Sequence, residues 1–169
     1  MTSWNLSGKK ALVTGGTKGI GLAITQEFLD LGAEVLAIAR DTKSIQGKLH
    51  NSANLFTMDG DVTDRAFRQR LVEKITTNWG KLDVLVNNVG TNVRKKFVDY
   101  TEEEYRQLFE TNLFSITEIT RLMFPLLQKS GKASVINMAS VAGTFDVLTG
   151  PPYGMTKAAI IQLTRHLAA

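Results

Sequence analysis

Residues 10–21 read "KALVTGGTKGIG", an apolar run followed by a glycine cluster and the start of a helical pattern. The glycines at positions 15, 19 and 21 follow the apolar run directly. Glycine permits a tight turn and lets a pyrophosphate approach backbone N–H groups, while a helix N-terminus adds favourable partial charge. The spacing G-x-x-x-G-x-G differs from the commonest dinucleotide fingerprint, so an ordinary glycine turn between a strand and a helix is the alternative.

Similar apolar runs recur along the chain, at residues 10–15, 34–40, 54–62, 82–90 and 133–140. Helical patterns lie between or after them, at residues 19–31, 64–78, 101–129 and from 152 to the end. Continuous apolar runs are typical of strands buried on both faces of a parallel sheet, and alternating β and α elements favour right-handed crossovers. The sequence therefore predicts one α/β domain over residues 1–169, with a doubly wound parallel sheet of the Rossmann-like kind.

Local signals set some of the expected boundaries. Gly32 and Gly80 are placed to end the first two helices, and Thr101 followed by Glu104 predicts a capping box that starts the third. If the strands take the order 3-2-1-4-5, the run at 133–140 lies at an edge, where a bare apolar strand is an aggregation hazard. We therefore expect the sheet to be incomplete at its C-terminal edge, with the chain shortened or that edge covered by something else.

Composition excludes several classes of function. The 169 residues carry a formal net charge of +4, have no cysteine, and place their two histidines far apart. Thiolate chemistry and disulfides are excluded, and no metal site is expected. The basic residues are scattered, so no nucleic-acid partner is expected, and no apolar run approaches the ~20 residues of a membrane helix. A cysteine-free chain without a signal-peptide pattern is compatible with a cytoplasmic location.

The end of the second apolar run bears on the choice of dinucleotide. Arg40 stands where an NAD-binding protein usually carries an acidic residue that grips the ribose 2′-hydroxyl, and a cation there favours the 2′-phosphate of NADP. Lys18, inside the glycine loop, could reach the same phosphate. Asp41 follows Arg40 directly and weakens this interpretation. The alternative is that both cations are ordinary surface residues.

A second constellation lies near the end of the chain, where Tyr153 and Lys157 are four residues apart. Side chains at this spacing meet on one helix face, and an ammonium beside a phenol lowers the pKa of the phenol and suits it to proton transfer. Ser140 ends the last apolar run, and strand ends share one crevice with the helix starts that follow them. Ser140 could therefore bind the same substrate oxygen. The alternative is that Tyr153 and Lys157 are ordinary surface residues without a chemical role.

Taken together, these motifs resemble the short-chain dehydrogenase/reductase family, and the wording "TGGTKGIG" and "NNVGTN" resembles its tropinone-reductase-like group. The resemblance rests on residues 14–21, "DV" at 61–62, "NNVG" at 87–90, Asn112, Ser140 and "YGMTK" at 153–157. It spans nearly the whole chain, but family members usually continue beyond the helix that carries Tyr153. Val89 also departs from the alanine that the family favours. The resemblance implies a chain truncated at its C-terminus.

The resemblance also implies roles. Tyr153 would be the general acid in reduction, Lys157 would bind the nicotinamide ribose, Ser140 would polarise the carbonyl, and Asn112 would hold a water in a proton relay. Without such a role, Asn112 would be a buried polar residue at a helix irregularity and Ser140 part of a strand-end turn. The predicted catalytic residues are Asn112, Ser140, Tyr153 and Lys157, and the predicted cofactor-binding residues are Gly15, Thr17, Lys18, Gly19, Ile20, Gly21, Arg40, Asp61, Val62, Asn88, Gly90, Tyr153 and Lys157.

The function expected from these patterns is an NADP(H)-dependent oxidoreductase that interconverts a carbonyl and an alcohol. A catalytically silent NADP-binding fragment or regulatory module is the alternative, and an isomerase or dehydratase fits the glycine spacing less well. The partners expected are a small ketone, aldehyde or alcohol, which residues 91–97 and 141–150 could contact unless these loops simply pack on the core. Apolar stretches at 122–127 and 158–163 would suit a homo-dimer or homo-tetramer.

Overall fold

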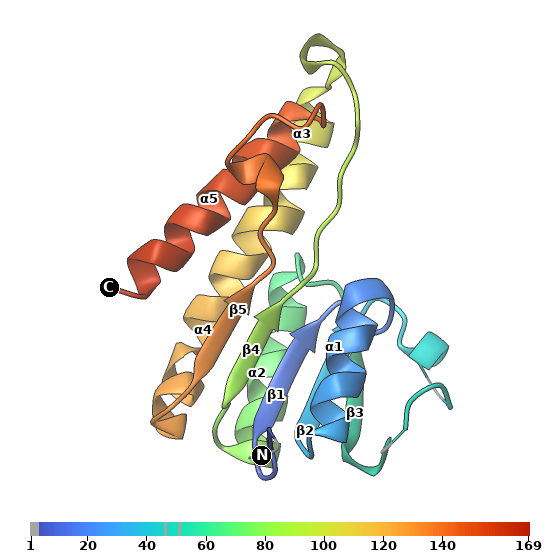
Figure 1. Ribbon diagram of the computed structural model, residues 1–169, viewed down its shortest axis with the longest axis vertical. Coiled ribbons are helices and arrows are strands. Elements are labelled where there is room, and N and C mark those ends of the chain that lie inside the picture. Colours follow the sequence, from blue (N-terminus) through green and yellow to red (C-terminus); the bar gives the residue numbers. More distant parts are fainter. Residues whose placement is uncertain (1–3, 46, 51) are drawn as a thin grey trace.

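The structure is a computed structural model that describes residues 4–45, 47–50 and 52–169. Its centre is a parallel sheet with the strand order β3-β2-β1-β4-β5 (Figure 1). The strands are β1 (Lys10–Thr14), β2 (Glu34–Ala39), β3 (Leu55–Asp59), β4 (Val84–Asn87) and β5 (Ser134–Asn137). The predicted strand order and the α/β fold class are confirmed.

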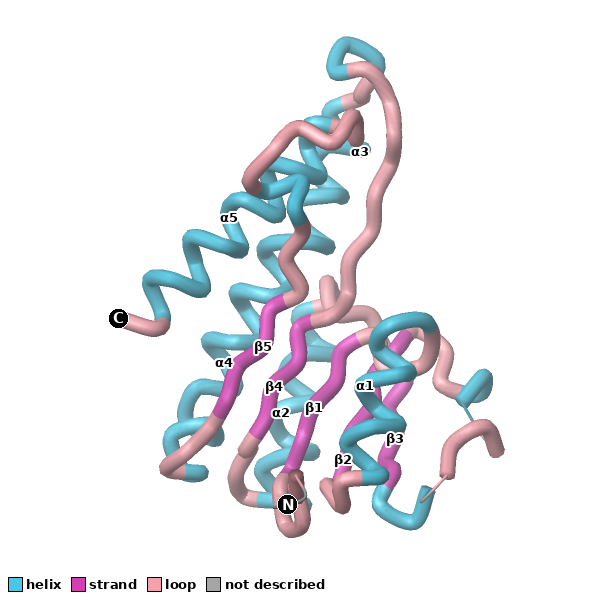
Figure 2. The backbone as a smooth tube through the Cα atoms, in the orientation of Figure 1, coloured by secondary structure: helices cyan, strands magenta, loops and turns pink. Residues whose placement is uncertain are grey.

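Helices cover both faces of this sheet. α1 (Gly19–Asp30) lies on one face, and α2 (Arg65–Trp79) and α4 (Ser115–Ser130) lie on the other (Figure 1). α3 (Glu102–Phe109) and the start of α5 (Pro151–Leu167) stand beyond the carboxyl ends of the strands (Figure 2). None of the helices within the described ranges is both long enough and apolar enough to cross a membrane.

The core is divided by the sheet, because successive side chains of a strand point to opposite faces. Leu12 and Leu36 pack with Phe67 of α2 and Met123 of α4 on one face. On the other face Ala11, Val13, Val35 and Val86 pack against Leu29 of α1. This alternation fixes the pairing register, since a slip of one residue would exchange the two faces.

The long helix predicted at 101–129 is not one α-helix. It begins as predicted, with a capping box in which Glu104 N–H donates to the Thr101 hydroxyl at 3.2 Å and Thr101 N–H donates to the Glu104 carboxylate at 3.1 Å. A π-helical turn, Glu110–Phe114, then separates α3 from α4. The helix predicted over residues 101–129 is therefore present, with its irregularity at the turn that contains Asn112. A single inserted residue leaves the apolar periodicity of a helical pattern almost unchanged.

The prediction that all strands are buried on both faces is also wrong for β5. Val135 is 36% exposed and Ile136 is 41% exposed, whereas their pairing partners Leu85 and Val86 on β4 are fully buried. β5 pairs with β4 on one side only and lies at the edge of the sheet. The incomplete C-terminal edge expected from the sequence is therefore confirmed.

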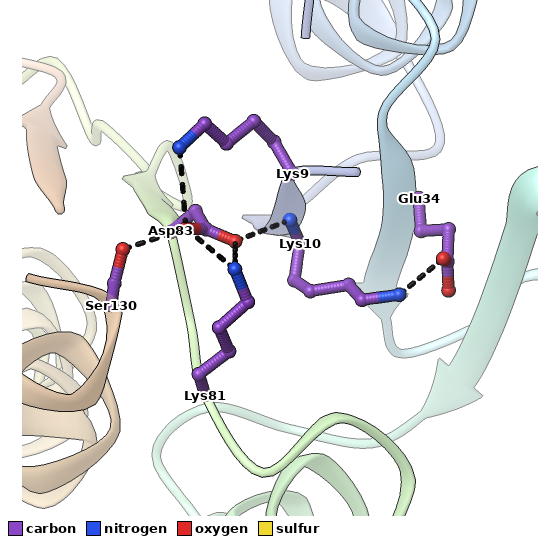
Figure 3. Close-up of polar contacts among 6 residues, drawn as sticks. All are labelled: Lys9, Lys10, Glu34, Lys81, Asp83 and Ser130. Atoms are coloured by element: carbon purple, nitrogen blue, oxygen red, sulfur yellow. Dashed lines mark hydrogen bonds and ion pairs between the residues drawn. The ribbon is translucent and has the colours of Figure 1, made fainter. Parts of the chain in front are cut away.

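A buried carboxylate joins the amino-terminal ends of the two central strands. Asp83 precedes β4, its side chain is 1% exposed, and it accepts hydrogen bonds from the Lys10 backbone N–H at 2.9 Å, from Ser130 Oγ at 2.6 Å and from Lys81 Nζ at 3.2 Å (Figure 3). Lys9 Nζ lies 3.6 Å away. Burial raises the pKa of Asp83, but the hydrogen bonds from Ser130, Lys10 and Lys81 outweigh it and lower that pKa to about 2.

We expect Asp83→Asn to lower the free energy of unfolding by about 2 kcal/mol at pH 7. The folded pKa of about 2 lies below the value of 3.8 for the free group. The stability that Asp83 contributes is therefore complete above pH 4 and disappears as the pH falls toward 2. Urea unfolding of both proteins at pH 7 and pH 3 measures this difference, with Glu103→Gln as the control because Glu103 is exposed. Equal stabilities of wild type and Asp83→Asn at pH 7 would contradict the assignment.

Candidate functional site

A large groove lies at the carboxyl ends of the strands. Its volume is about 1530 Å³, above the range of about 300–1,000 Å³ usual for small ligands. The glycine loop, the ends of β2, β3 and β4, and one side of α3 form its walls. The predicted residues that line it are Gly15, Thr17, Lys18, Ile20, Gly21, Arg40, Asp61, Val62, Asn88 and Gly90. Of the predicted glycine-loop residues, Gly19 is the one outside this lining.

The glycine loop is built for close backbone approach. Gly15 has φ 65°, a conformation that favours glycine, and a Cβ at Gly21 would overlap the Gly15 carbonyl oxygen. α1 starts directly after this turn, and its N-cap residue Lys18 makes no side-chain capping bond. No acidic residue lies in the first turn of α1. The first N–H groups of the helix are therefore left to an anion, and a pyrophosphate fits this end of the groove.

Asn88 holds the glycine loop to the end of β4. Its side-chain Nδ2 donates to the Thr14 carbonyl at 3.0 Å and to the Gly15 carbonyl at 3.2 Å, while its backbone N–H donates to the Thr14 hydroxyl at 2.9 Å. Val89 N–H donates to the same hydroxyl at 3.2 Å. Asn88 therefore lines the groove, as predicted, and also shapes it by fixing the glycine loop.

Two exposed cations, Lys18 and Arg40, line one end of the groove, as the sequence predicts for a 2′-phosphate site. Asp41, which weakened that interpretation, uses one carboxylate oxygen to accept a hydrogen bond from the Lys43 backbone N–H at 2.9 Å. Asp61 likewise turns one oxygen toward Thr63, accepting from its N–H at 2.9 Å and its hydroxyl at 2.8 Å. Both carboxylates keep their negative charge and line the same groove as the two cations.

Asn112 lies in the π-helical turn and is fully buried. Its carboxamide bonds the backbone of Thr91 twice, accepting from the N–H at 2.8 Å and donating to the carbonyl at 2.8 Å. Asn112 Nδ2 also lies 3.3 Å from the Thr156 hydroxyl on α5. One side chain therefore ties together the π turn, the segment after β4 and the helix that carries Tyr153.

Tyr153 and Lys157 share the first turns of α5, which begins at Pro151 after the N-cap Gly150. Lys157 is 4% exposed, and its Nζ donates to the Met138 carbonyl at 2.6 Å and lies 5.6 Å from the centre of the Tyr153 ring. Burial lowers the pKa of Lys157. This is a buried ammonium with one hydrogen bond to the protein and two donor positions left over.

Ser140 lies beside this helix through a tightly packed turn. It caps the 3₁₀ turn Val141–Gly143 by accepting from the Ala142 N–H at 3.2 Å. A Cβ at Gly143 would approach the Lys157 carbonyl carbon to 2.7 Å, and one at Gly154 would approach the Ala142 carbonyl oxygen to 2.9 Å. Only glycines allow this contact, which places the Ser140 turn directly on the Tyr153–Lys157 turn of α5.

The structure thus brings the predicted catalytic residues to one place. A Cβ at Gly90, a residue of the groove lining, would lie 3.6 Å from both Asn112 Oδ1 and Lys157 Nζ. Gly90 is therefore the point where the groove meets two of the predicted catalytic residues, Asn112 and Lys157. Ser140, Tyr153 and Lys157 lie outside the groove lining, on α5 and the turn packed against it.

Sequence reasoning missed two threonines that build the site. Thr14 bonds Asn88 and Val89 through its hydroxyl, and Thr91 bonds Asn112 through its backbone. Thr14 stands at the end of an apolar strand, which is a usable signal for a strand-end hydroxyl. Thr91 acts through its main chain, and no side-chain pattern could have identified it.

The chain was compared with known proteins. A family profile described as short chain dehydrogenase matches residues 9–169. A tropinone reductase homolog of Arabidopsis thaliana is 43% identical over 98% of this chain, and the match covers 64% of that protein. A second tropinone reductase homolog of the same plant is 45% identical over 98% of this chain and 65% of its own length.

Solved structures resemble the chain as well. An active-site complex of Pseudomonas aeruginosa RhlG with NADP has a TM-score of 0.88 and 34% sequence identity, and the match covers 98% of this chain and 68% of that one. The chain spans about two thirds of the length of these relatives, 64% of the first plant protein.

The buried Lys157 leads to a prediction about stability. We expect Lys157→Met to raise the free energy of unfolding at pH 7 by on the order of 1 kcal/mol, because a methionine removes the cost of burying an ammonium. The folded pKa lies below the ordinary value of 10.5, so unfolding takes up a proton between the two values. Wild-type stability therefore rises with pH in that range, and the advantage of the variant shrinks as the pH approaches 10.5.

Urea unfolding of both proteins at pH 7 and at about pH 9.5 measures this difference. The matched control is Lys132→Met, which removes an exposed ammonium. A Lys157→Met protein that is less stable than wild type at pH 7 would show that the ammonium contributes more through Met138 than its burial costs.

Proposed function

The chain belongs to the short-chain dehydrogenase family, and we propose that it carries the nucleotide site and the proton-transfer group of an NADP(H)-dependent oxidoreductase that interconverts a carbonyl and an alcohol. One observation carries the proposal. Asn112 and Lys157 meet at Gly90, where the dinucleotide-sized groove ends, and Tyr153 lies on the same helix as Lys157. A nucleotide site and a proton donor are the two parts that carbonyl reduction requires.

The groove suits a phosphorylated dinucleotide for reasons of shape and charge. The approach of Gly21 to Gly15 and the uncapped start of α1 favour a pyrophosphate. Lys18 and Arg40 favour a further phosphate on the adenosine ribose. The structural relative from Pseudomonas aeruginosa is itself a complex with NADP, which supports the choice of NADP over NAD.

The nicotinamide, when bound, supplies or accepts the hydride. The Tyr153 hydroxyl would donate a proton to the carbonyl oxygen during reduction and take it back during oxidation. Lys157, with donor positions left beside the Tyr153 ring, would bind a ribose hydroxyl and keep positive charge near the phenol. Ser140 would donate a hydrogen bond from its hydroxyl to the same carbonyl oxygen and so polarise the carbonyl group.

Asn112 would contribute by positioning the segment after Gly90, without contacting the substrate. Because its carboxamide is used on the Thr91 backbone, it holds the residue after Gly90 against α5 and leaves the Lys157 ammonium facing the groove end. A water bound near Lys157 could then carry protons to and from solvent. A small ketone or aldehyde partner, a homo-oligomeric state and a cytoplasmic location stay predictions from the sequence.

Tyr153→Phe tests the proton-transfer role. We expect turnover of ketones with NADPH to fall by about 1,000-fold, since a positioned acid or base contributes on the order of 10²–10⁴. The Kd for NADPH should change less than about threefold, because the phenylalanine keeps the ring beside Lys157. Absorbance assays with a ketone panel and a fluorescence titration with NADPH measure the two quantities.

Equal turnover by the Tyr153→Phe variant would remove Tyr153 from the mechanism. If wild type binds NADPH but turns over no carbonyl compound, the oxidoreductase proposal fails and a nucleotide-binding module takes its place.

Arg40→Asp tests the choice of cofactor. A charge-assisted bond to phosphate stabilises binding by about 1.5–3 kcal/mol, so we expect wild type to prefer NADPH over NADH by about tenfold or more. The variant should reverse that order, because a carboxylate repels the 2′-phosphate and accepts from a 2′-hydroxyl. Arg70→Asp makes the same change of charge outside the groove lining and should keep the wild-type preference. An unchanged preference in Arg40→Asp would contradict the assignment.

A further inference from the structure

Two loops meet beyond the carboxyl ends of the strands, next to the start of α5 (Figure 2). One follows Gly90 and leads to α3, and the other leads from the Ser140 turn to α5. Asn92 of the first loop donates from Nδ2 to the Thr149 hydroxyl of the second at 2.7 Å. Thr149 lies two residues before Pro151, the first residue of α5. The bond therefore holds the segment that immediately precedes Tyr153.

The start of α5 has no cap of its own. Gly150 is the N-cap residue and offers no side chain, and Pro151 and Pro152 have no N–H to donate. The first turn is closed by the Tyr153 N–H, which donates to the Gly150 carbonyl at 3.1 Å. The backbone of Tyr153 is therefore tied directly to Gly150, and no side chain of Gly150 or of the two prolines holds this end of α5.

Gly150 is held by the loop that follows Asn92. It is buried, and a Cβ there would overlap the Tyr100 hydroxyl and come within 2.5 Å of the Val93 carbonyl oxygen. The Tyr100 hydroxyl donates to that same Val93 carbonyl. Gly150 thus packs on a small platform made by Tyr100 and Val93, and a larger residue would push the start of α5 away from it.

The other end of this connection is fixed to the groove. Thr91, the neighbour of Asn92, is bonded twice by the buried Asn112 side chain. The segment 144–148, which precedes Thr149 in the chain, is exposed. Within it, Leu148 has φ 54°, and its N–H donates to Asp146 Oδ1 at 2.9 Å. Thr149 therefore separates an exposed turn from the helix that carries Tyr153.

We infer that Asn92 and Thr149 form a latch that sets the position of Tyr153 relative to the groove, so that Asn92 is a positioning residue for the proposed carbonyl chemistry. The expected effect of this latch on kcat rests on the proposed function. The latch transmits the fixed position of Thr91 to Gly150, and Gly150 sets the first turn of α5. Movement of the exposed segment 144–148 then leaves Tyr153 in place.

The chain contains a matched control for this bond. Asn137 Nδ2 donates to the Thr164 hydroxyl at 2.9 Å, so the same pair of residue types holds α5 near its other end. Thr149→Val and Thr164→Val remove one such bond each. If the two bonds only add stability, Thr149→Val and Thr164→Val should have the same effect on kcat. If Asn92 and Thr149 form a latch, Thr149→Val should lower kcat and Thr164→Val should not.

We expect Thr149→Val in the 169-residue chain to lower kcat for carbonyl reduction by about tenfold, since small misplacements of reacting groups cost up to ~100-fold. The Kd for NADPH should change less than about twofold. Asn92→Ala should have the same effect, and the double variant should be no worse than either single one, because both remove one bond. Thr149→Ser keeps the hydroxyl and should restore kcat to within about threefold. Thr164→Val should keep the wild-type kcat.

Hydrogen exchange of the Tyr153 and Gly154 amides gives a readout that needs no turnover. Both amides donate to the Gly150 carbonyl, and Thr149→Val and Asn92→Ala should speed their exchange by about tenfold while Thr164→Val does not. Exchange and kcat that match those of Thr164→Val would overturn the latch. If wild type shows no turnover, the proposed function fails, and the exchange rates alone support or overturn the latch.

Discussion

The carboxamide of Asn112 is the interaction on which the site depends. A fully buried amide must satisfy both its donor and its acceptor, and Asn112 does so on the backbone of Thr91. That pair of hydrogen bonds fixes the chain just after β4, and with it Gly90 and Asn92. The π turn places Asn112 between the sheet and α5. Asn112 therefore joins the segment after β4 to the helix that carries Tyr153, in addition to the packing of α3 on α5.

Much of the fold follows from short-range patterns. Continuous apolar runs predict the strands, and the glycine loop predicts where the first strand turns into α1, because no other residue fits Gly21 beside Gly15. The capping box at Thr101 and Glu104 forms as the local spacing requires. These features could be predicted because each depends on neighbours within a few residues. The strand order also follows, since parallel strands with crossover helices have few arrangements.

What the sequence could not predict depends on pairs far apart in the chain. The bonds of Asn112 to Thr91 and of Asn92 to Thr149 join residues 21 and 57 positions apart, and one of them uses main-chain atoms. The exposure of Val135 and Ile136 depends on which elements lie beside β5, and an apolar run looks the same whether it is covered or bare. The sequence offers a helix irregularity at Asn112 as an alternative, but it cannot show that this is a π turn, because the turn changes the helical pattern by one residue only.

Two features of the proposed site lower the stability of the fold, and hydrogen bonds elsewhere in the sheet offset part of this cost. Lys157 is buried with one carbonyl partner, and α5 begins at Gly150 without a side-chain cap. Burial of the Lys157 ammonium costs free energy where the proposed chemistry needs a positive charge, and the missing cap leaves N–H groups of α5 without a side-chain partner. Compensation comes from sites at a distance from the chemistry, such as the bonds to Asp83 at the opposite ends of the strands. The Asp83 bonds thus stabilise the amino ends of the sheet, away from the carboxyl ends where the proposed site lies.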